Sequence, residues 1–322
     1  MLSVIMRVFS RAIALAGSML LMALKPPLSL WERLRFGDNE DGAEQPVFII
    51  GAPRTGSTIL YQALTNAYLF AYIDNTACIW HRNLRFGLWL SQRKYGDAPH
   101  DNFKAEHGST SSYGGHAPSE CGEFWYRWLP RDRHFIDHDE ITDQMVKGIR
   151  EEVLGASKYL QRPLLFKNLN AGQRLRLIRK AFPEAKIIFV RRDPRFVARS
   201  ILNARRKVGT PSNRWWSIMP ANVEELLQLP EAEMCVAQVY YLERQIEEDL
   251  KLFPKENVQI IHYQELGDAL IRRLAEWCGV AARPGGQMPG FLRDNPAGLP
   301  AHERLELELL VGNYPFSKEL FV

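Results

Sequence analysis

Four short apolar segments recur along the chain. They are Pro46–Ile50, Pro163–Phe166, Lys186–Val190 and Val258–His262. Largely uninterrupted apolar runs of this length are typical of strands that are buried on both faces of a parallel sheet. The pattern therefore predicts four parallel strands.

Segments with helical periodicity separate these strands. They cover Thr58–Asn66, Ile141–Tyr159, Gln173–Phe182, Arg195–Lys207, Asn222–Phe253 and Asp268–Cys278. Strands that alternate with helices predict an α/β fold, a three-layer sandwich with a central parallel sheet, whose ligand binds at the carboxyl ends of the strands. No interior stretch resembles a linker, so residues 46–322 are expected to form one domain, preceded by a helix and linker over residues 1–45.

The N-terminal segment is apolar but interrupted by arginines. Its longest apolar run, Ala12–Leu24, spans 13 residues, fewer than the roughly 20 that cross the hydrocarbon core of a membrane. The polar and small residues fall near one helical stripe, which comprises Ser3, Arg7, Arg11, Ala14 and Ser18. This pattern predicts an amphipathic helix that lies on a membrane surface and ends at Lys25–Pro27. A membrane-spanning helix and a helix packed on its own domain stay open.

Composition and charge narrow the class of protein. With 46% hydrophobic and 24% charged residues, the chain is not of the disordered class. The formal net charge is only +4, but residues 172–207 carry twelve basic side chains against two acids. This local excess indicates either a small polyanionic ligand or a solvated face. No RNA- or DNA-binding motif accompanies it, so a nucleic-acid partner is not expected.

The cysteines indicate neither a metal site nor a disulfide framework. Cys78, Cys121, Cys235 and Cys278 lie far apart and form no CxxC or Cys/His ligand spacing. We therefore expect no bound metal and a reduced, cytoplasmic environment, with the N-terminal helix on the inner face of the membrane as the peripheral alternative.

A glycine-containing loop follows the first predicted strand and opens a helix. In the stretch Gly51–Thr58, backbone N–H groups and the helix dipole can bind a phosphate. The spacing resembles a Walker A loop, but Ser57 occupies the position where a P-loop NTPase or kinase has its lysine. The cation lies earlier, at Arg54, which can bind two oxyanions at once, and Ser57 and Thr58 add hydroxyl donors.

A second strand-to-helix junction lies at Phe189–Ser200. Arg192 follows the strand, Pro194 suits the first turn of the helix, and Ser200 comes about two turns later. A phosphate beside this helix could contact both Arg192 and Ser200. The alternative is an ordinary basic helix face.

Together the two junctions resemble the sulfotransferase family that uses 3′-phosphoadenosine 5′-phosphosulfate, whose fold is P-loop NTPase-like. In that family a Pro-(Lys/Arg)-x-Gly-(Ser/Thr)-Thr loop binds the 5′-phosphosulfate, and Arg-x-Pro followed by Ser binds the 3′-phosphate. Pro53–Thr58 and Arg192–Pro194 with Ser200 match in order and spacing. The resemblance implies this donor as co-substrate and no metal. It assigns the donor to Arg54, Thr55, Gly56, Ser57, Thr58, Arg192 and Ser200.

A third segment extends the resemblance, and two differences from the cytosolic members of the family refine it. His262–Leu266 looks like the family's Tyr-Glu-Asp-Leu element, which implies that Tyr263 lies near the adenine, although a core tyrosine fits as well. Ile59 replaces a tryptophan of the cytosolic members, and Phe166–Leu169 lacks their catalytic histidine. The chain is therefore similar to the bacterial-type branch, which acts largely on carbohydrates, lipids and other metabolites.

Sulfuryl transfer needs a base for the acceptor hydroxyl and positive charge on the departing oxygen. Arg54 suits the second task, and Lys167, at the end of a predicted strand, assists it. For the base we expect Glu120, then His116, then Glu123, since bacterial-type relatives have a similar Pro-x-Glu-x-Gly-x-Phe-Trp segment on the acceptor side. A purely structural Glu120 in the first turn of a helix stays open.

The sequence thus predicts direct in-line transfer of a sulfuryl group to a hydroxyl of a glycan, lipid or other small molecule. Two alternatives stay open. One is a nucleotide-binding protein of the same fold without turnover, and the other is a P-loop nucleotide kinase, which the missing lysine at Ser57 disfavours.

Overall fold

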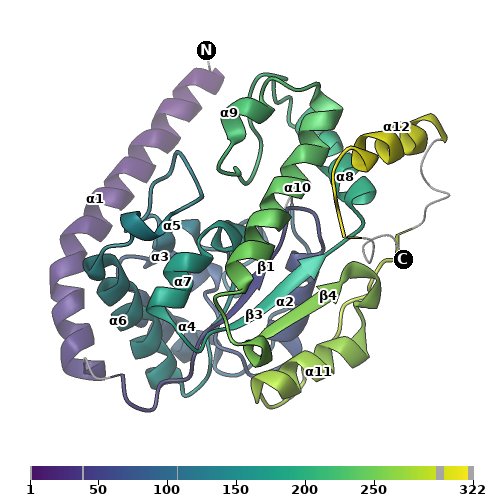
Figure 1. Cartoon of the computed structure of the whole chain (residues 1–322). Coiled ribbons are helices and arrows are strands. Elements are labelled where there is room, and N and C mark those ends of the chain that lie inside the picture. Colours follow the sequence, from purple (N-terminus) through teal and green to yellow (C-terminus); the bar gives the residue numbers. More distant parts are fainter. Residues whose placement is uncertain (1, 38–39, 107, 295–300, 318–322) are drawn as a thin grey trace.

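A four-stranded parallel sheet forms the centre of the protein (Figure 1). The computed structural model describes residues 2–37, 40–106, 108–294 and 301–317. The strand order is β2-β1-β3-β4, and the strands are β1 (Val47–Ile50), β2 (Leu165–Lys167), β3 (Lys186–Arg191) and β4 (Val258–His262). The four predicted strands and their parallel pairing are confirmed.

Helices cover both faces of the sheet, which confirms the three-layer α/β fold. Alternate side chains of β1 face opposite layers: Phe48 packs in one core and Ile49 in the other, and neither is exposed. The Phe48 side is covered by α6 (Asp143–Leu160), α7 (Leu175–Ala181) and the end of α10 (Glu231–Leu250). The Ile49 side is covered by α2 (Ser57–Ala67) and α11 (Asp268–Cys278).

The other helices are shorter or lie at the periphery. They are α3 (Asn75–Ile79), α4 (Leu84–Tyr95), α5 (Gly122–Trp125), α8 (Pro194–Lys207), α9 (Val223–Leu226) and α12 (Ala301–Gly312). Single 3₁₀ turns occupy His138–Glu140, Leu169–Gln173, Lys255–Asn257 and Tyr263–Glu265. One predicted helix, Asn222–Phe253, is divided because Pro230 precedes α10, and the residue before a proline is disfavoured in helical conformation.

The N-terminal helix α1 (Leu2–Phe36) runs along the outer edge of the molecule (Figure 1). The predicted end at Lys25–Pro27 is wrong, because the helix continues through both prolines. Each proline inside a helix costs about 3 kcal/mol, and contacts beyond them offset this cost. Glu32 accepts hydrogen bonds from the Phe86 N–H at 2.8 Å and from Asn83 Nδ2 at 3.0 Å.

The amphipathic stripe predicted near the start of α1 lies outside the described side chains, since those of residues 1–16 and 18 are not described. In the part of the chain that the structure describes, no helix is long and apolar enough to cross a membrane.

A disulfide joins Cys78, in α3, to Cys121, which precedes α5. Their Cα atoms lie 5.6 Å apart although 43 positions separate them in the sequence. The expectation of no disulfide was wrong because sequence spacing says nothing about two segments that the fold brings together. Disulfides persist in oxidising surroundings, which differ from the reduced environment expected above.

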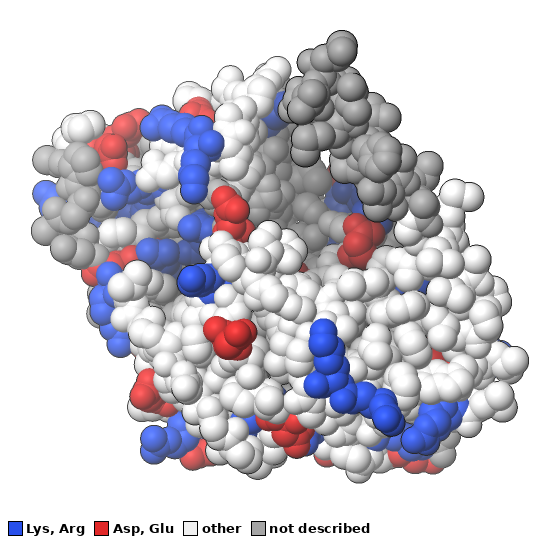
Figure 2. Space-filling view, turned by 180° about the vertical axis from the view of Figure 1, so that it is seen from behind, with Lys and Arg blue, Asp and Glu red and all other residues white. Residues whose placement is uncertain are grey.

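The basic stretch of residues 172–207 is largely neutralised in the fold. Ion pairs hold at least eight of its twelve basic side chains, namely Arg176, Lys180, Arg191, Arg192, Arg195, Arg199, Arg205 and Arg206. Several of the acids come from α10, for example Glu231 and Glu243. Acidic side chains accordingly lie beside basic ones on the face shown in Figure 2. Within this stretch, Arg192 is the arginine that reaches the cavity described next.

Candidate active site

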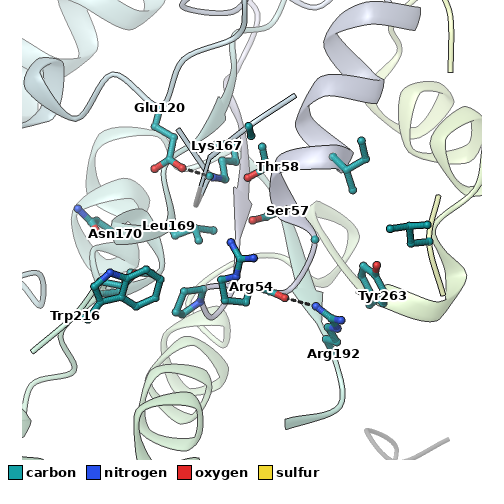
Figure 3. Close-up of a pocket in the computed structure, with 18 of the residues that line it drawn as sticks. Arg54, Ser57, Thr58, Glu120, Lys167, Leu169, Asn170, Arg192, Trp216 and Tyr263 are labelled. Carbon is teal, nitrogen blue, oxygen red and sulfur yellow. Dashed lines mark hydrogen bonds and ion pairs between the residues drawn. The ribbon is translucent and has the colours of Figure 1, made fainter. Parts of the chain in front are cut away.

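A cavity of about 620 Å³ opens at the carboxyl ends of β1, β2 and β3 (Figure 3). The residues that follow parallel strands meet at this edge, as expected for a doubly wound sheet. The charged and hydroxyl side chains in its wall include Arg54, Ser57, Thr58, Glu120, Lys167 and Arg192. The structure therefore brings together groups from four separate parts of the sequence.

The loop between β1 and α2 needs its glycines. Gly51 has φ +152°, and a Cβ there would lie 2.5 Å from the Val190 carbonyl oxygen. Gly56 has φ +86°, and a Cβ there would lie 2.6 Å from the ring of Tyr263. Only glycine fits both positions, so the loop can lie close to β3 on one side and to Tyr263 on the other.

Arg54 is held in the loop with its guanidinium facing the cavity (Figure 3). Its φ of 72° is unusual for a non-glycine residue, and such strain is concentrated at functional sites. Its Nε donates to Ser200 Oγ at 2.9 Å. Among the described residues no carboxylate pairs with Arg54. Burial, and secondly the charge of Arg192, lower its pKa. Within the described part of the chain this guanidinium has no counter-ion at the cavity wall, and an oxyanion bound in the cavity can take that place.

The start of α2 supplies further donors. Gly56 precedes the helix and has no side chain to cap it, so the N–H groups of Ser57 and Thr58 are available to an anion in the cavity. The fully buried hydroxyl of Thr55 turns back to donate to the Ala52 carbonyl at 3.0 Å. Thr55 stabilises the loop and offers only its backbone to a ligand.

Arg192 lies at the other end of the cavity. Its Nη1 donates to the Arg54 carbonyl at 2.7 Å, and its guanidinium lies 4.2 Å from the ring centre of Tyr263. Its Nε and Nη2 donate to the carboxylate of Asp294. Ser200, predicted as its partner on a phosphate, instead contacts Arg54.

Glu120 and Lys167 form an ion pair inside the cavity (Figure 3). The Lys167 side chain is only 1% exposed and that of Glu120 36%. Gly108 approaches both closely, since a Cβ built on it would lie 3.3 Å from Glu120 Oε1 and from Lys167 Nζ. The same point lies 3.6 Å from the Thr58 hydroxyl. A carboxylate, an ammonium and a hydroxyl are therefore gathered around one position.

The structure places the other two base candidates elsewhere. His116 lies outside the wall of this cavity, where its Nδ1 is 3.0 Å from Asp74 Oδ2 and its Nε2 3.0 Å from the Ala98 carbonyl oxygen. Glu123 pairs with Arg131 at the surface, and this contact lowers its pKa. Neither side chain faces the Glu120–Lys167 pair, because α5 and its preceding loop turn them in other directions.

His134 lines the cavity, although nothing in the sequence distinguished it from the other histidines. Its Nδ1 accepts a hydrogen bond from the Met219 N–H at 2.8 Å. Burial, and secondly the nearby Arg174, lower its pKa to about 4, so the ring is neutral at pH 7 with its proton on Nε2. The lone pair on Nδ1 is thus engaged by the Met219 N–H. The ring can therefore act as a hydrogen-bond donor through Nε2, rather than as a base.

The comparisons with known proteins agree with these motifs. The model of a family described as "Sulfotransferase family" matches residues 46–284. The chain belongs to the sulfotransferase family. None of the curated proteins compared with it matches it.

Solved sulfotransferases resemble this sulfotransferase distantly. Sulfotransferase STF1 from Mycobacterium tuberculosis H37Rv is 11% identical, with a TM-score of 0.49 over 91% of this chain and 80% of that chain. STF9 from Mycobacterium avium is 16% identical, with a TM-score of 0.48 over 90% of this chain and 73% of that chain. A sulfotransferase from Alicyclobacillus acidocaldarius is 15% identical, with a TM-score of 0.44 over 84% of this chain and 92% of that chain.

The cavity wall and the groups in contact with it include residues that sequence reasoning did not identify. Besides His134, these are Gly108, Asn170 and Asp294. Trp216 lines the cavity as well. Asn170 lies in the single 3₁₀ turn Leu169–Gln173 and the others in irregular connections, where no periodic pattern indicates the direction of a side chain.

Proposed function

We propose that this sulfotransferase moves a sulfuryl group from 3′-phosphoadenosine 5′-phosphosulfate to the hydroxyl of a glycan, lipid or other small molecule by direct in-line transfer. The observation that carries the proposal is that Arg54 and Arg192 line the same cavity. A 2.7 Å hydrogen bond from Arg192 Nη1 to the Arg54 carbonyl fixes their relative position. Two arginines in fixed relation suit a ligand that carries anionic groups at two places.

The residues present fit this donor. The guanidinium of Arg54, which no carboxylate of the described residues pairs with, and the N–H groups that begin α2 suit a 5′-phosphosulfate. Arg192, at the exit of β3, suits a 3′-phosphate. Tyr263, which packs against Gly56 and lines the cavity, offers a flat face for the adenine.

Each charged group then has a role in the transfer. The donor supplies the sulfuryl group, and Glu120 accepts the proton of the attacking hydroxyl. Arg54, assisted by Lys167, stabilises the negative charge that develops on the oxygen of the departing nucleotide. Beside this centre, Phe103, Leu169 and Trp216 form an apolar wall for the acceptor, and Asn170 and His134 add hydrogen-bonding groups.

Binding of the product nucleotide tests the donor. Calorimetric titration with 3′-phosphoadenosine 5′-phosphate is expected to show tight binding that 5′-AMP and ATP–Mg²⁺ do not match. Arg192→Ala is expected to weaken this binding severely, whereas Arg54→Ala is expected mainly to abolish transfer. A preference for ATP–Mg²⁺ would reject the donor, and equal losses of binding in both variants would reject the division of roles.

We also propose that α1 holds the enzyme on an anionic membrane surface. Its outward face carries an apolar stripe, at the helical spacing Met19, Ala23, Pro26, Leu30 and Leu34. Met19 is 64% exposed and Leu34 81%. The exposed charges described on this helix are basic, namely Lys25, Arg33 and Arg35, while its one acid, Glu32, is buried. An apolar stripe flanked by basic residues is complementary to anionic lipid.

Vesicle sedimentation tests this surface. Full-length protein is expected to sediment with vesicles that contain phosphatidylglycerol, and less with pure phosphatidylcholine vesicles. The pair Leu30→Gln and Leu34→Gln is expected to reduce binding at least fivefold. Leu305→Gln with Leu309→Gln provides a matched control, since both leucines are exposed on α12. Equal binding by both pairs, or a dimer that depends on Leu30 and Leu34, would overturn the membrane proposal.

A further inference from the structure

Asp294 occupies the donating edge of Arg192. Its Oδ1 and Oδ2 lie 3.2 and 3.0 Å from Arg192 Nε, and Oδ1 also accepts from Nη2. The Asp294 side chain is 4% exposed and that of Arg192 18%. This is a forked, charge-assisted pair of the kind that a guanidinium forms with a phosphate.

Two other groups also contact Arg192. Nη1 is already engaged by the Arg54 carbonyl at 2.7 Å, and one face of the guanidinium lies over Tyr263 at 4.2 Å. A phosphate that binds this fork therefore competes directly with the Asp294 carboxylate. A phosphate beside an undisplaced carboxylate would experience like-charge repulsion.

The chain around Asp294 is part of the same cavity. Gly290 and Leu292 line it, and Leu292 is 79% exposed, whereas Met288 and Phe291 pack against the core on the Ile49 side of the sheet. The stretch is therefore anchored before Leu292, and the Asp294 carboxylate adds an attachment to Arg192. Release of one ion pair would free Arg192 without disturbing the sheet.

We propose that Asp294 is an internal competitor for the 3′-phosphate of the nucleotide. The carboxylate holds Arg192 extended in the free enzyme, gives way when the 3′-phosphate binds, and returns as the product nucleotide leaves. This inference rests on the proposed donor. Asp294 is a positioning residue, which lowers nucleotide affinity and thereby favours product release.

The variant Asp294→Asn tests the competition. It preserves size and removes the charge, so 3′-phosphoadenosine 5′-phosphate is expected to bind about tenfold more tightly in calorimetry. Binding of 5′-AMP is expected to stay unchanged, because that ligand has no 3′-phosphate to compete. Asp294→Glu retains the charge and is expected to restore wild-type affinity. Glu308→Gln is the matched control, since it removes one negative charge that pairs with Arg195 and Arg304 instead.

Two further results separate this inference from the donor proposal. In an Arg192→Ala background, Asp294→Asn is expected to have no effect, because the contested group is gone. If the wild type binds the nucleotide and Asp294→Asn binds it more weakly or equally well, the competition by Asp294 is rejected and the proposed donor is retained. Absence of binding by wild type and variant alike would reject the donor itself. Thermal melting of each variant confirms folding.

Discussion

Gly108 brings the backbone close to both members of the Glu120–Lys167 pair. Gly108→Ala would place a methyl group 3.3 Å from Glu120 Oε1 and Lys167 Nζ, at φ +94°. We expect turnover to fall about tenfold or more, because displaced groups no longer meet the acceptor correctly. Nucleotide affinity is expected to change less than twofold.

Gly209 provides the control for backbone strain. It has φ +68° but nothing lies within 4 Å of a Cβ there, so Gly209→Ala tests strain without crowding. Equal losses of kcat in the two variants would mean that Gly108 matters only for its backbone conformation.

Glu120→Gln separates binding from proton transfer. The amide keeps the size of the side chain but is not a base, so kcat is expected to fall about 10²- to 10⁴-fold with nucleotide affinity retained. Steady-state kinetics together with calorimetry measure both quantities. Wild-type turnover in this variant would remove Glu120 from the base role.

The residues that sequence reasoning found and missed differ in a simple physical way. Arg54 and Arg192 lie at strand-to-helix junctions, where the local pattern alone directs the side chain to the sheet edge. Asp294 reaches Arg192 from 102 positions away along an irregular segment, and His134 is distinguished only by its burial. Neither position carries a local signal that could have revealed it.

At the scale of elements, continuous apolar runs predicted every strand of the sheet and most of the helices that cover it. The helices α3, α4, α5 and α12 were not predicted. Of these, α3 and α5 have only five and four residues, too few to show a helical period. The continuation of α1 past Pro26 and Pro27 was missed as well, since packing against α4 outweighs local propensity.

The disulfide between α3 and α5 is expected to stabilise the fold. In the chain-entropy model, closing a loop with a sequence separation of 43 contributes about 4 kcal/mol. Cys78→Ala with Cys121→Ala should therefore lower the thermal midpoint by several degrees. Turnover should fall as well, because Cys121 follows Glu120 directly.

Thiol titration in denaturant provides an independent measurement. Two reactive thiols are expected before reduction, from Cys235 and Cys278, and four after it. Four thiols in protein purified without reductant would contradict the pairing.

At the scale of the whole molecule, buried titratable groups predict a loss of stability in mild acid. Burial is the first cause that lowers the pKa of His100 and of His134 to about 4. Each then binds a proton in the unfolded chain before it does so in the folded one. Stability is therefore complete above pH 6.5 and falls as the pH drops towards 4. Burial also raises the pKa of Glu243 to about 7, so this group binds a proton in the folded chain before it does so in the unfolded one. Its effect on stability is opposite to that of the histidines and cancels roughly the contribution of one of them.

Together these three groups differ by about one proton between the folded and unfolded chain, so they should lower the free energy of unfolding by about 1.5 kcal/mol between pH 6.5 and 5.0. Guanidinium unfolding at several pH values measures it. His134→Gln should flatten the dependence, and an unchanged slope in that variant would exclude His134 as a source.

Charge composition alone does not decide between a ligand site and a charged surface. The twelve basic side chains of residues 172–207 indicated either a small polyanionic ligand or a solvated face, and the fold distributes most of them among ion pairs. Only distances in three dimensions separate Arg192, which reaches the cavity, from basic neighbours that pair elsewhere.

The two halves of the cavity come from different kinds of chain segment. The groups assigned to the donor follow β1, β3 and β4, whereas Phe103, Gly108 and Glu120 lie in the connection between α4 and α6, and Trp216 in that between α8 and α9. Neither connection contains a strand of the sheet. The proposed donor site and the proposed acceptor wall are therefore built by different segments of the chain. Chimaeras that transplant only these connections would redirect sulfation to new acceptors while nucleotide affinity stays constant.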